Sequence, residues 1–539
     1  MPYLNTQEAE TKLELLSLQY PALCRLVQLT NITYEGRTSH ALILRTGSRV
    51  KRPGVYLVGC LHAREWGSAD LLLYLAETLL ISYTNNTDVT LIGATFTADK
   101  IRSILENVEL IIFPVVNPDG RTYNQESGIS WRKNRAPTSQ AGVLGTDINR
   151  NFNFLWDYPQ YFLPGTYPAS TNPQWETYYG TAPFSEAETK NVKELADLHP
   201  NIRYFVDVHS AGQLLLYPWG DDTNQTNDPL MNFRNSSYNA MRGNIDDTTY
   251  SEYMEQVDLT RYQNTSNRLK LALQQVRSKQ YTPGPTSTTL YIVSGASLDY
   301  MYSRHIVDRT KRKIDTFLIE WGQAFQPAYS EMTEIIMDVS SALIELCLTA
   351  QELPLTNKTP DPLDFKTIQL GTTKTIQLRL DNLGIGAVEL FNIQIQGTGF
   401  SINLTTLGPI QEGDHSFIPV TFVPPANGPA TGKLIFKFRK PGVTTEDIAD
   451  VQLLAAGCSV PKGSCTAPVF SPSNWFVCLL LAIAAPAVIL GMLILIWIPG
   501  MLCALKRFIF RVQHCTQGND NPCIVLIKYT LWPLSKRNN

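Results

Sequence analysis

Residues 54–83 read GVYLVGCLHAREWGSADLLLYLAETLLISY and contain both kinds of element that the first two thirds of the chain repeats. The opening GVYLVGC is an uninterrupted apolar run, typical of a strand buried on both faces. The second half has helical periodicity, with an apolar stripe formed by Leu71, Leu72, Leu75, Leu79 and Leu80. Residues 29–36 and 39–47 read as a pair of strands, and further short apolar runs of the buried-strand type lie at residues 108–117, 203–210 and 316–322. Strands separated by helices predict an α/β domain over residues 1–352, with a mixed central β-sheet flanked by helices and a closing helix from Glu331 to Leu348.

The pattern of predicted secondary structure changes after this domain. Residues 353–362 contain the Pro- and Asn-rich stretch PLTNKTPDP and predict a linker. From residue 363 to 457 short strands alternate with Gly and Pro turns; in TIQLRLDN, Ile376, Leu378 and Leu380 alternate with polar residues. This pattern predicts an all-β immunoglobulin-like sandwich, and the segment also resembles ASH-type immunoglobulin-like modules. We interpret it as a spacer or adhesion module without catalytic residues, whose partner the sequence does not name.

The last part of the chain predicts a membrane anchor. No charged residue occurs between Lys462 and Lys506, and residues 475–505 are almost wholly apolar. That run exceeds the ~20 residues that a helix needs to cross a bilayer. We therefore expect a juxtamembrane linker at 458–474, one transmembrane helix at 475–505 and a basic tail at 506–539.

The charges around this span predict its orientation. The tail carries six basic residues against the single acid Asp520, so the positive-inside rule places the tail in the cytoplasm and the catalytic domain outside or in a lumen. The first 16 residues lack the basic and apolar regions of a signal peptide. Either the span alone directs insertion, or another segment of the protein precedes residue 1.

Length and charge narrow the class of protein further. At 539 residues the chain is too long for one ordinary domain, and two or three folded units are expected. The net charge is only −3, and there is no basic stripe, so nucleic-acid binding has no electrostatic support.

A candidate metal site follows the strand at residues 54–60. His62 and Glu65 are three residues apart, so an imidazole and a carboxylate on one turn can point at the same place. A catalytic zinc needs a third protein ligand, and His209, at the end of another apolar run, is the best candidate. On spacing alone, His-x-x-Glu pairs also arise by chance, and a satisfied core histidine would explain His209 better than a metal ligand would.

Seven motifs in a fixed order change this assessment. They are HAREW (62–66), NPDG (117–120), WRKNR (131–135), TDINRNF (146–152), HSAGQLLLYPWG (209–220), LYIVSGASLDY (290–300) and FLIEWG (317–322). With these motifs, residues 5–350 resemble the carboxypeptidase A/B family of funnel-type zinc peptidases. The resemblance implies one Zn²⁺ per catalytic domain, a mixed sheet flanked by helices, and an active site at the carboxyl ends of central strands.

The resemblance assigns the reacting groups position by position. His62, Glu65 and His209 match the zinc ligands. Glu320 matches the general base that takes a proton from water and passes it to the leaving amine, a role that suits a carboxylate beside zinc. Arg132 matches the arginine that stabilises the oxyanion.

The resemblance also implies how a substrate is held. Asn149 and Arg150 match the pair that binds the terminal carboxylate, and Tyr291 matches the residue that closes over it. A guanidinium suits this role because its planar fork can meet a carboxylate through two hydrogen bonds. Arg64 resembles a more distant subsite residue, and Asp147 resembles the acid that orients the first histidine ligand.

Three positions bear on selectivity. Leu298 occupies the position that is apolar in A-type and acidic in B-type enzymes, so we expect a preference for hydrophobic or aromatic C-terminal residues. Ala296 replaces a more usual glycine, which would narrow the pocket slightly. Ala211 stands where an aromatic residue is common, which puts one distal subsite in doubt.

The sequence therefore predicts a membrane-tethered zinc metallocarboxypeptidase that trims the C-termini of peptides or proteins. The first alternative is an adhesion or binding protein whose peptidase-like domain has lost catalysis; the complete ligand set, Arg132 and Glu320 argue against it. The second alternative is a related zinc hydrolase that cleaves another amide, such as a side-chain glutamate. An acidic substrate would need a basic pocket, which Leu298 does not supply.

Overall fold

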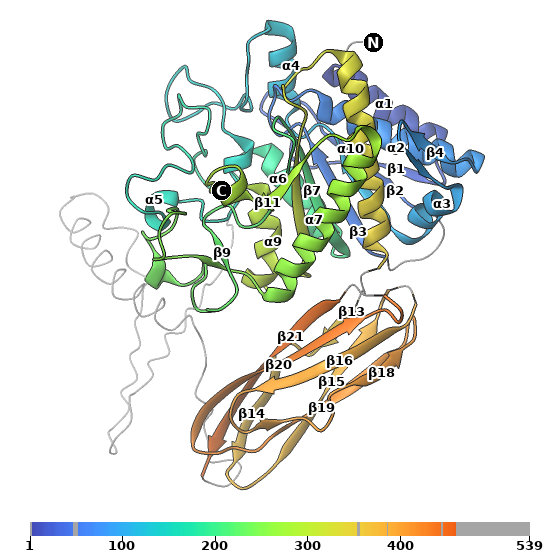
Figure 1. The fold of residues 1–539 in the computed structure, drawn as a ribbon. Coiled ribbons are helices and arrows are strands. Elements are labelled where there is room, and N and C mark those ends of the chain that lie inside the picture. Colours follow the sequence, from blue (N-terminus) through green and yellow to red (C-terminus); the bar gives the residue numbers. More distant parts are fainter. Residues whose placement is uncertain (1–2, 47–51, 353–355, 385, 444–445, 460–539) are drawn as a thin grey trace, which may run out of the picture. The chain divides into compact units, whose positions relative to one another are not determined.

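The computed structural model describes residues 3–46, 52–352, 356–384, 386–443 and 446–459 (Figure 1). All of these residues belong to one compact unit, Met1–Ala467. The predicted transmembrane helix, residues 475–505, the tail that follows it and most of the juxtamembrane linker lie outside the described residues. Among the helices that are described, none combines the length and apolar character needed to cross a membrane.

An eight-stranded mixed sheet forms the centre of the first region. Its order is β1 (Cys24–Gln28), β2 (His40–Leu44), β6 (Glu109–Phe113), β3 (Gly54–Gly59), β7 (Ile202–Ser210), β12 (Asp315–Trp321), β8 (Leu214–Tyr217) and β11 (Thr282–Pro285). The four central strands β6, β3, β7 and β12 run parallel, whereas β1, β2 and β8 form antiparallel pairs. Every residue of β3 and β7 is buried, as the uninterrupted apolar runs predict.

Helices flank this sheet. They are α1 (Thr6–Gln19), α2 (Gly67–Asn85), α3 (Ala98–Asn107), α4 (Pro118–Ser127), α5 (Tyr158–Tyr161), α6 (Ala187–Leu198), α7 (Gln256–Arg277), α8 (Thr286–Thr289), α9 (Ser297–Val307) and α10 (Tyr329–Ala350). The predicted leucine stripe of α2 is buried, and α2 packs against α10, α3 and α1. Helix α9 packs against β7 and β12, and the Tyr56 hydroxyl of β3 donates to the Val192 carbonyl of α6 (3.4 Å). The predicted mixed sheet flanked by helices is confirmed.

The N-terminal strand prediction was partly wrong. Residues 29–36 are not a strand; β1 lies earlier, and His40–Leu44 forms β2. Two tertiary contacts explain the difference, because the Thr33 hydroxyl donates to Asp119 (2.8 Å) and the Asn31 backbone N–H donates to Asn191 (3.0 Å). These bonds hold the segment against α4 and α6 rather than in the sheet.

The chain continues as two further sheets around a second hydrophobic core. One sheet has the order β13 (Thr356–Thr359), β15 (Lys374–Asn382), β19 (His415–Phe422) and β17 (Phe400–Ser401). The other has the order β14 (Leu363–Gln369), β21 (Asp447–Cys458), β20 (Gly428–Arg439), β16 (Val388–Gln396) and β18 (Leu407–Ile410). Both contribute buried residues to one apolar cluster, so we call residues 356–458 the β-sandwich. Strand β13 occupies part of the segment expected to be a linker, because it pairs with β15.

Candidate functional site

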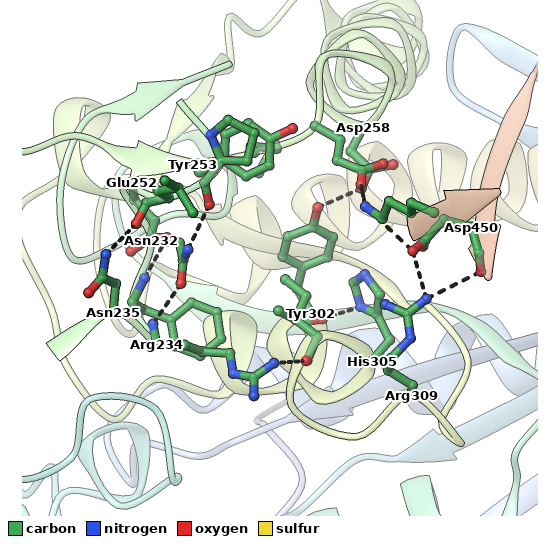
Figure 2. A pocket seen from close by; sticks show the side chains of 17 residues that line it. Asn232, Arg234, Asn235, Glu252, Tyr253, Asp258, Tyr302, His305, Arg309 and Asp450 are labelled. Atoms are coloured by element: carbon green, nitrogen blue, oxygen red, sulfur yellow. Dashed lines mark hydrogen bonds and ion pairs between the residues drawn. The ribbon is translucent and has the colours of Figure 1, made fainter. Parts of the chain in front are cut away.

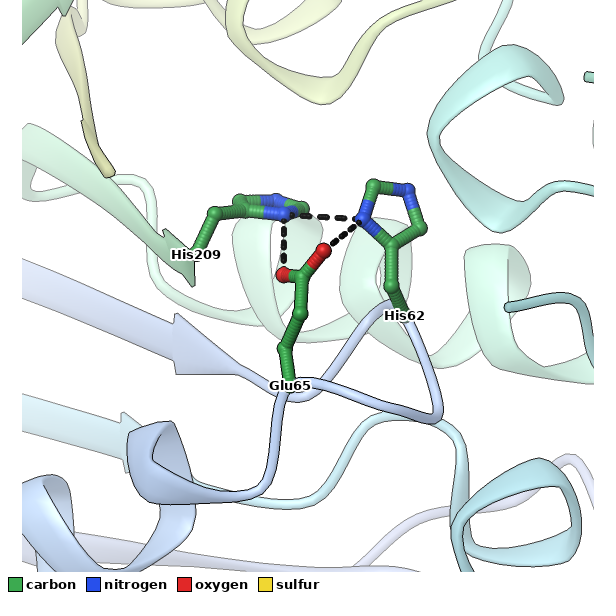
Figure 3. A group of neighbouring side chains, drawn as sticks. All are labelled: His62, Glu65 and His209. Atoms are coloured by element: carbon green, nitrogen blue, oxygen red, sulfur yellow. Dashed lines mark hydrogen bonds and ion pairs between the residues drawn. The ribbon is translucent and has the colours of Figure 1, made fainter. Parts of the chain in front are cut away.

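The ends of β3 and β7 place the three predicted metal ligands together (Figure 3). His62 and Glu65 lie on the turn between β3 and α2, and His209 is the second-last residue of β7. Their ligand atoms all lie within 4.8 Å of one another. Glu65 Oε1 is 2.8 Å from His62 Nδ1, its Oε2 is 2.9 Å from His209 Nδ1, and the two Nδ1 atoms are 3.1 Å apart. All three side chains are buried.

Two carboxylates orient the imidazoles from outside this group. His62 Nε2 is 3.2 Å from Asp147 Oδ1, and His209 Nε2 is 2.9 Å from Asp207 Oδ1. In the tautomer that carries its proton on the outer nitrogen, beside the carboxylate, each imidazole turns its Nδ1 lone pair inward. Two inward nitrogens and a carboxylate are the donor set of a catalytic zinc with one open position, so the residues fit the ion that the sequence predicts.

Glu320 extends from β12 toward the same cavity. It pairs in register with His209 of the parallel neighbour β7, so both side chains leave adjacent strands at the same level. Glu320 Oε2 is buried and has no hydrogen-bond partner among the residues that the structure describes. Burial, followed by the nearby Glu65 carboxylate, raises the pKa of Glu320 to about 7. A carboxyl group with that pKa can accept and release a proton near neutral pH.

Asp147 connects the metal group to Arg132. It precedes the short turn Ile148–Arg150 and accepts from the Asn149 backbone N–H (3.0 Å). Arg132 donates through Nε to Asp147 Oδ2 (3.0 Å), and its Nη2 lies equally close. Burial opposes ionisation of the Asp147 carboxyl, but Arg132 and His62 hold its pKa well below the usual range. The arrangement fixes a guanidinium beside the metal ligands.

Asn149 and Arg150 line the same cavity from the next turn. The Asn149 side-chain oxygen accepts from the Ser297 backbone N–H (2.8 Å), and Arg150 donates to the Pro168 carbonyl (2.8 Å) and the Asn149 carbonyl (2.8 Å). Arg150 lies 5.9 Å from the ring centroid of Tyr291, whose side chain is exposed. These residues can therefore meet an anionic group that enters from solvent.

Arg64 is on the rim of the cavity. It donates through Nη1 to both oxygens of Glu176 (2.9 and 3.1 Å) and lies 4.5 Å from the ring centroid of Phe325. Glu176 is more than half exposed, so this pair faces solvent.

The cavity has a volume of about 240 Å³, and its walls include His62, Glu65, Arg132, Asn149, Arg150, Ala211, Ala296, Leu298 and Glu320. One end is apolar, because Leu298 packs with Leu216 and Leu318. A wider hollow of about 740 Å³ shares Arg64, Arg132 and Arg150 with it. Apart from His209 and Asp147, which lie directly behind the wall, every predicted site residue lines one of these two spaces.

Sequence reasoning missed four residues of this site. Asp207 is two positions before His209, and Leu318 is two positions before Glu320, so the strand period of two could have identified both. Glu176 and Phe325 come from loops, and no local pattern indicates them.

Comparison with known proteins agrees with this geometry. The family profile described as zinc carboxypeptidase matches residues 9–338. Metallocarboxypeptidase A of Trichophyton tonsurans is 34% identical over 273 residues, which cover 50% of this chain and 53% of that protein. Carboxypeptidase A4 of Mus musculus is 30% identical over 295 residues, which cover 55% and 58% of the two chains. The matched part thus spans about half the length of each relative.

A solved structure shows the same fold. The crystal structure of thrombin activatable fibrinolysis inhibitor superposes with a TM-score of 0.50 and 21% sequence identity, covering 64% of this chain and 73% of that one. At this identity the likeness concerns the fold alone. Because the family profile matches more than half of the sequence and the ligand geometry agrees with it, the chain belongs to the zinc carboxypeptidase family.

Proposed function

We propose that this chain is a zinc-dependent metallocarboxypeptidase that hydrolyses the C-terminal peptide bond of peptides or proteins. One observation carries the proposal: Glu320 lines the same cavity as His62 and Glu65, which group with His209, and its Oε2 atom is buried without a hydrogen-bond partner among the described residues. A metal-binding group alone would not need an unpaired buried carboxylate, which is costly to maintain. The same observation disfavours an inactive adhesion protein.

Each side chain then has a defined task. Zinc held by His62, Glu65 and His209 would polarise the scissile carbonyl and make a neighbouring water more acidic. Glu320 accepts a proton from the attacking water and returns it to the leaving amine. Arg132, held by Asp147, stabilises the negative charge that develops on the carbonyl oxygen.

The other cavity residues position the substrate. Asn149 and Arg150 bind the terminal carboxylate, which makes the reaction specific for C-termini. Tyr291 is exposed beside Arg150 and can cover the bound residue, and Arg64 contacts the chain further from the scissile bond. A peptide bond in the middle of a chain offers no carboxylate to Arg150 and is not cleaved.

Hydrophobic or aromatic C-terminal residues are the preferred substrates. The support is the apolar end of the cavity, where Leu298 and Leu318 are buried. A lysine or arginine side chain would lose its hydration there without meeting a carboxylate. An acidic side chain would lack a basic partner at the same place.

We further propose that residues 475–505 tether the enzyme to a membrane, with the catalytic domain outside or in a lumen and the tail in the cytoplasm. The support is the apolar run and the basic residues after it. In this arrangement residues 1–352 form the catalytic domain, and the β-sandwich follows it in the sequence, before the anchor. Protease protection on sealed vesicles tests this topology, because a tail that is digested from outside contradicts it.

The catalytic proposal is tested with the purified chain and peptides that differ only in their last residue. Phe and Leu should be released, Lys and Glu much more slowly, and a chelator should stop the reaction until zinc is restored. Glu320→Gln should retain zinc and lose activity. Release of Phe at the wild-type rate by Glu320→Gln would contradict the mechanism, and equal release of Lys and Phe would contradict the selectivity.

A further inference from the structure

The first residue of β21 in the β-sandwich binds side chains of the preceding α/β region. Asp447 is only 3% exposed. Its Oδ2 accepts from Arg203 Nη2 of β7 (2.6 Å), and its Oδ1 accepts from Arg261 Nη1 of α7 (3.2 Å). Both arginines are themselves almost completely buried. Asp447 therefore forms a buried contact across the two regions.

Arg261 extends this contact into a larger ion cluster. It donates to both oxygens of Asp315, the first residue of β12 (2.7 and 2.9 Å), and to Asp258 (2.7 Å). Lys313 also donates to Asp258 (2.8 Å). Among the residues joined by these ion pairs, the α/β region supplies three cations and two carboxylates, and Asp447 is the third carboxylate.

Because the cluster is buried, the balance between its positive and negative charges matters for the stability of the fold. Burial alone would raise the pKa of the Asp447 carboxyl, but Arg203 and then Arg261 lower it below the usual value, so the carboxylate stays ionised. Replacing a whole buried ion cluster by apolar residues is often harmless, whereas removing one partner leaves an uncompensated charge and is strongly destabilising. Without Asp447, Arg203 and Arg261 would lose the one carboxylate that contacts both of them, while Arg261 would keep Asp315 and Asp258.

The ion cluster lies at the beginnings of β7 and β12, whereas the candidate active site lies at the carboxyl ends of the same two strands. Arg203 precedes His209 by six residues on β7, and Asp315 precedes Glu320 by five residues on β12. At the rise of an extended strand, these separations are about 20 Å and about 17 Å. The contact can therefore support the two strands without touching the catalytic cavity.

We propose that the β-sandwich is a required folding partner of the α/β region, joined to it through Asp447, rather than the spacer or adhesion module that the sequence suggests. The partner surface consists of Arg203 and Arg261, and it selects a buried carboxylate. This inference concerns stability and does not depend on the catalytic activity.

A second acid on the same strand provides a matched control. Asp450 also binds a residue of the α/β region, since Arg309 donates to it (2.7 Å), and Lys433 lies 3.4 Å away. Asp450 and Arg309 help to line a hollow of about 460 Å³, as do Asp258 and Tyr302. Figure 2 shows Asp450 and Arg309 side by side among these lining residues. The side chains of this outer pair are 21–35% exposed, so water screens their interaction.

The experiment compares Asp447→Asn with Asp450→Asn in the full chain by calorimetry. Asp447→Asn keeps the shape and removes the charge, and it should lower the Tm of the α/β region by roughly 5–10 °C. Asp450→Asn should change it by no more than about 2 °C. Equal Tm values for the two variants would overturn the proposal.

A reciprocal variant keeps the test decisive if Asp447→Asn gives no folded protein. Arg203→Met removes the same ion pair from the α/β side, and hydrogen exchange should then increase in β21 as well as in β7. The double variant should be less destabilised than the sum of the two single variants, because both remove one shared interaction. Exchange confined to the mutated region, together with additive effects, would show that the β-sandwich folds independently.

Discussion

Asp147→Asn is the most informative single substitution at the site, because one carboxylate contacts both a proposed metal ligand and the arginine proposed to stabilise the oxyanion. Asp147 is fully buried, lies 3.2 Å from His62 Nε2 and accepts from Arg132 at 3.0 Å. An asparagine of the same shape can keep one of these hydrogen bonds but cannot balance the guanidinium charge. In the wild type, Asp147 raises the pKa of Arg132 above its ordinary value against the effect of burial. The guanidinium keeps its charge in the variant as well, because arginine is not deprotonated in proteins.

The contacts of Asp147 determine which three effects are expected, on folding stability, on kcat and on metal affinity. Breaking a buried charge pair costs about 3–5 kcal/mol of folding stability in comparable cases. Loss of one oxyanion-stabilising donor lowers kcat by about 10²–10³-fold. Loss of an acid that orients a metal-bound histidine weakens metal affinity by about 10–100-fold. We expect all three effects from Asp147→Asn.

The assay measures kcat/KM on a peptide ending in Phe, zinc affinity by competition with a chromophoric chelator, and unfolding by denaturant. Glu176→Gln is the matched control, because it breaks an arginine–carboxylate pair on the rim of the same cavity whose acid is 55% exposed. That pair should contribute no more than about 1 kcal/mol to stability. If Asp147→Asn kept its zinc affinity and a kcat/KM within about threefold of the wild type, the role assigned to Asp147 would be refuted.

Three further predictions follow from the charges and the pocket. Leu298→Asp should decrease kcat/KM for C-terminal Phe and increase it for Lys, each by roughly 10–100-fold, because the buried carboxylate then meets a cation; unchanged ratios for the two peptides would contradict the pocket assignment. Removal of zinc should lower the Tm of the wild type in proportion to the logarithm of free zinc, and a Tm independent of zinc would exclude binding to the folded state. The pKa values of Asp258 and Asp447 in the folded protein lie below the unfolded value of about 4. These carboxylates therefore stabilise the fold fully above that pH, and this stabilisation is lost as the pH falls below it. Urea unfolding between pH 6 and 3 should show the loss in the wild type and a smaller loss in Asp447→Asn.

The sequence contained much of the site because the relevant signals are local. His62 and Glu65 occupy one turn after an apolar strand, and HAREW together with the six later motifs predicted their partners. Strands β3, β7 and β12 were predicted correctly, since a strand buried on both faces needs an uninterrupted apolar run. The strand prediction at residues 29–36 failed because its decisive bonds, from Thr33 to Asp119 and from Asn31 to Asn191, join residues far apart in the chain.

The amino-acid sequence by itself determined the α/β organisation, the family and the candidates for the reacting groups. These follow from periodicity and from short motifs, each of which is complete within a few residues. Only the tertiary structure decided that Asp207 supports His209, that Glu176 holds Arg64, and that Asp447 completes an ion cluster with Arg203 and Arg261. Charges interact through space, so which carboxylate neutralises which buried cation is settled only when the packed strands bring them together.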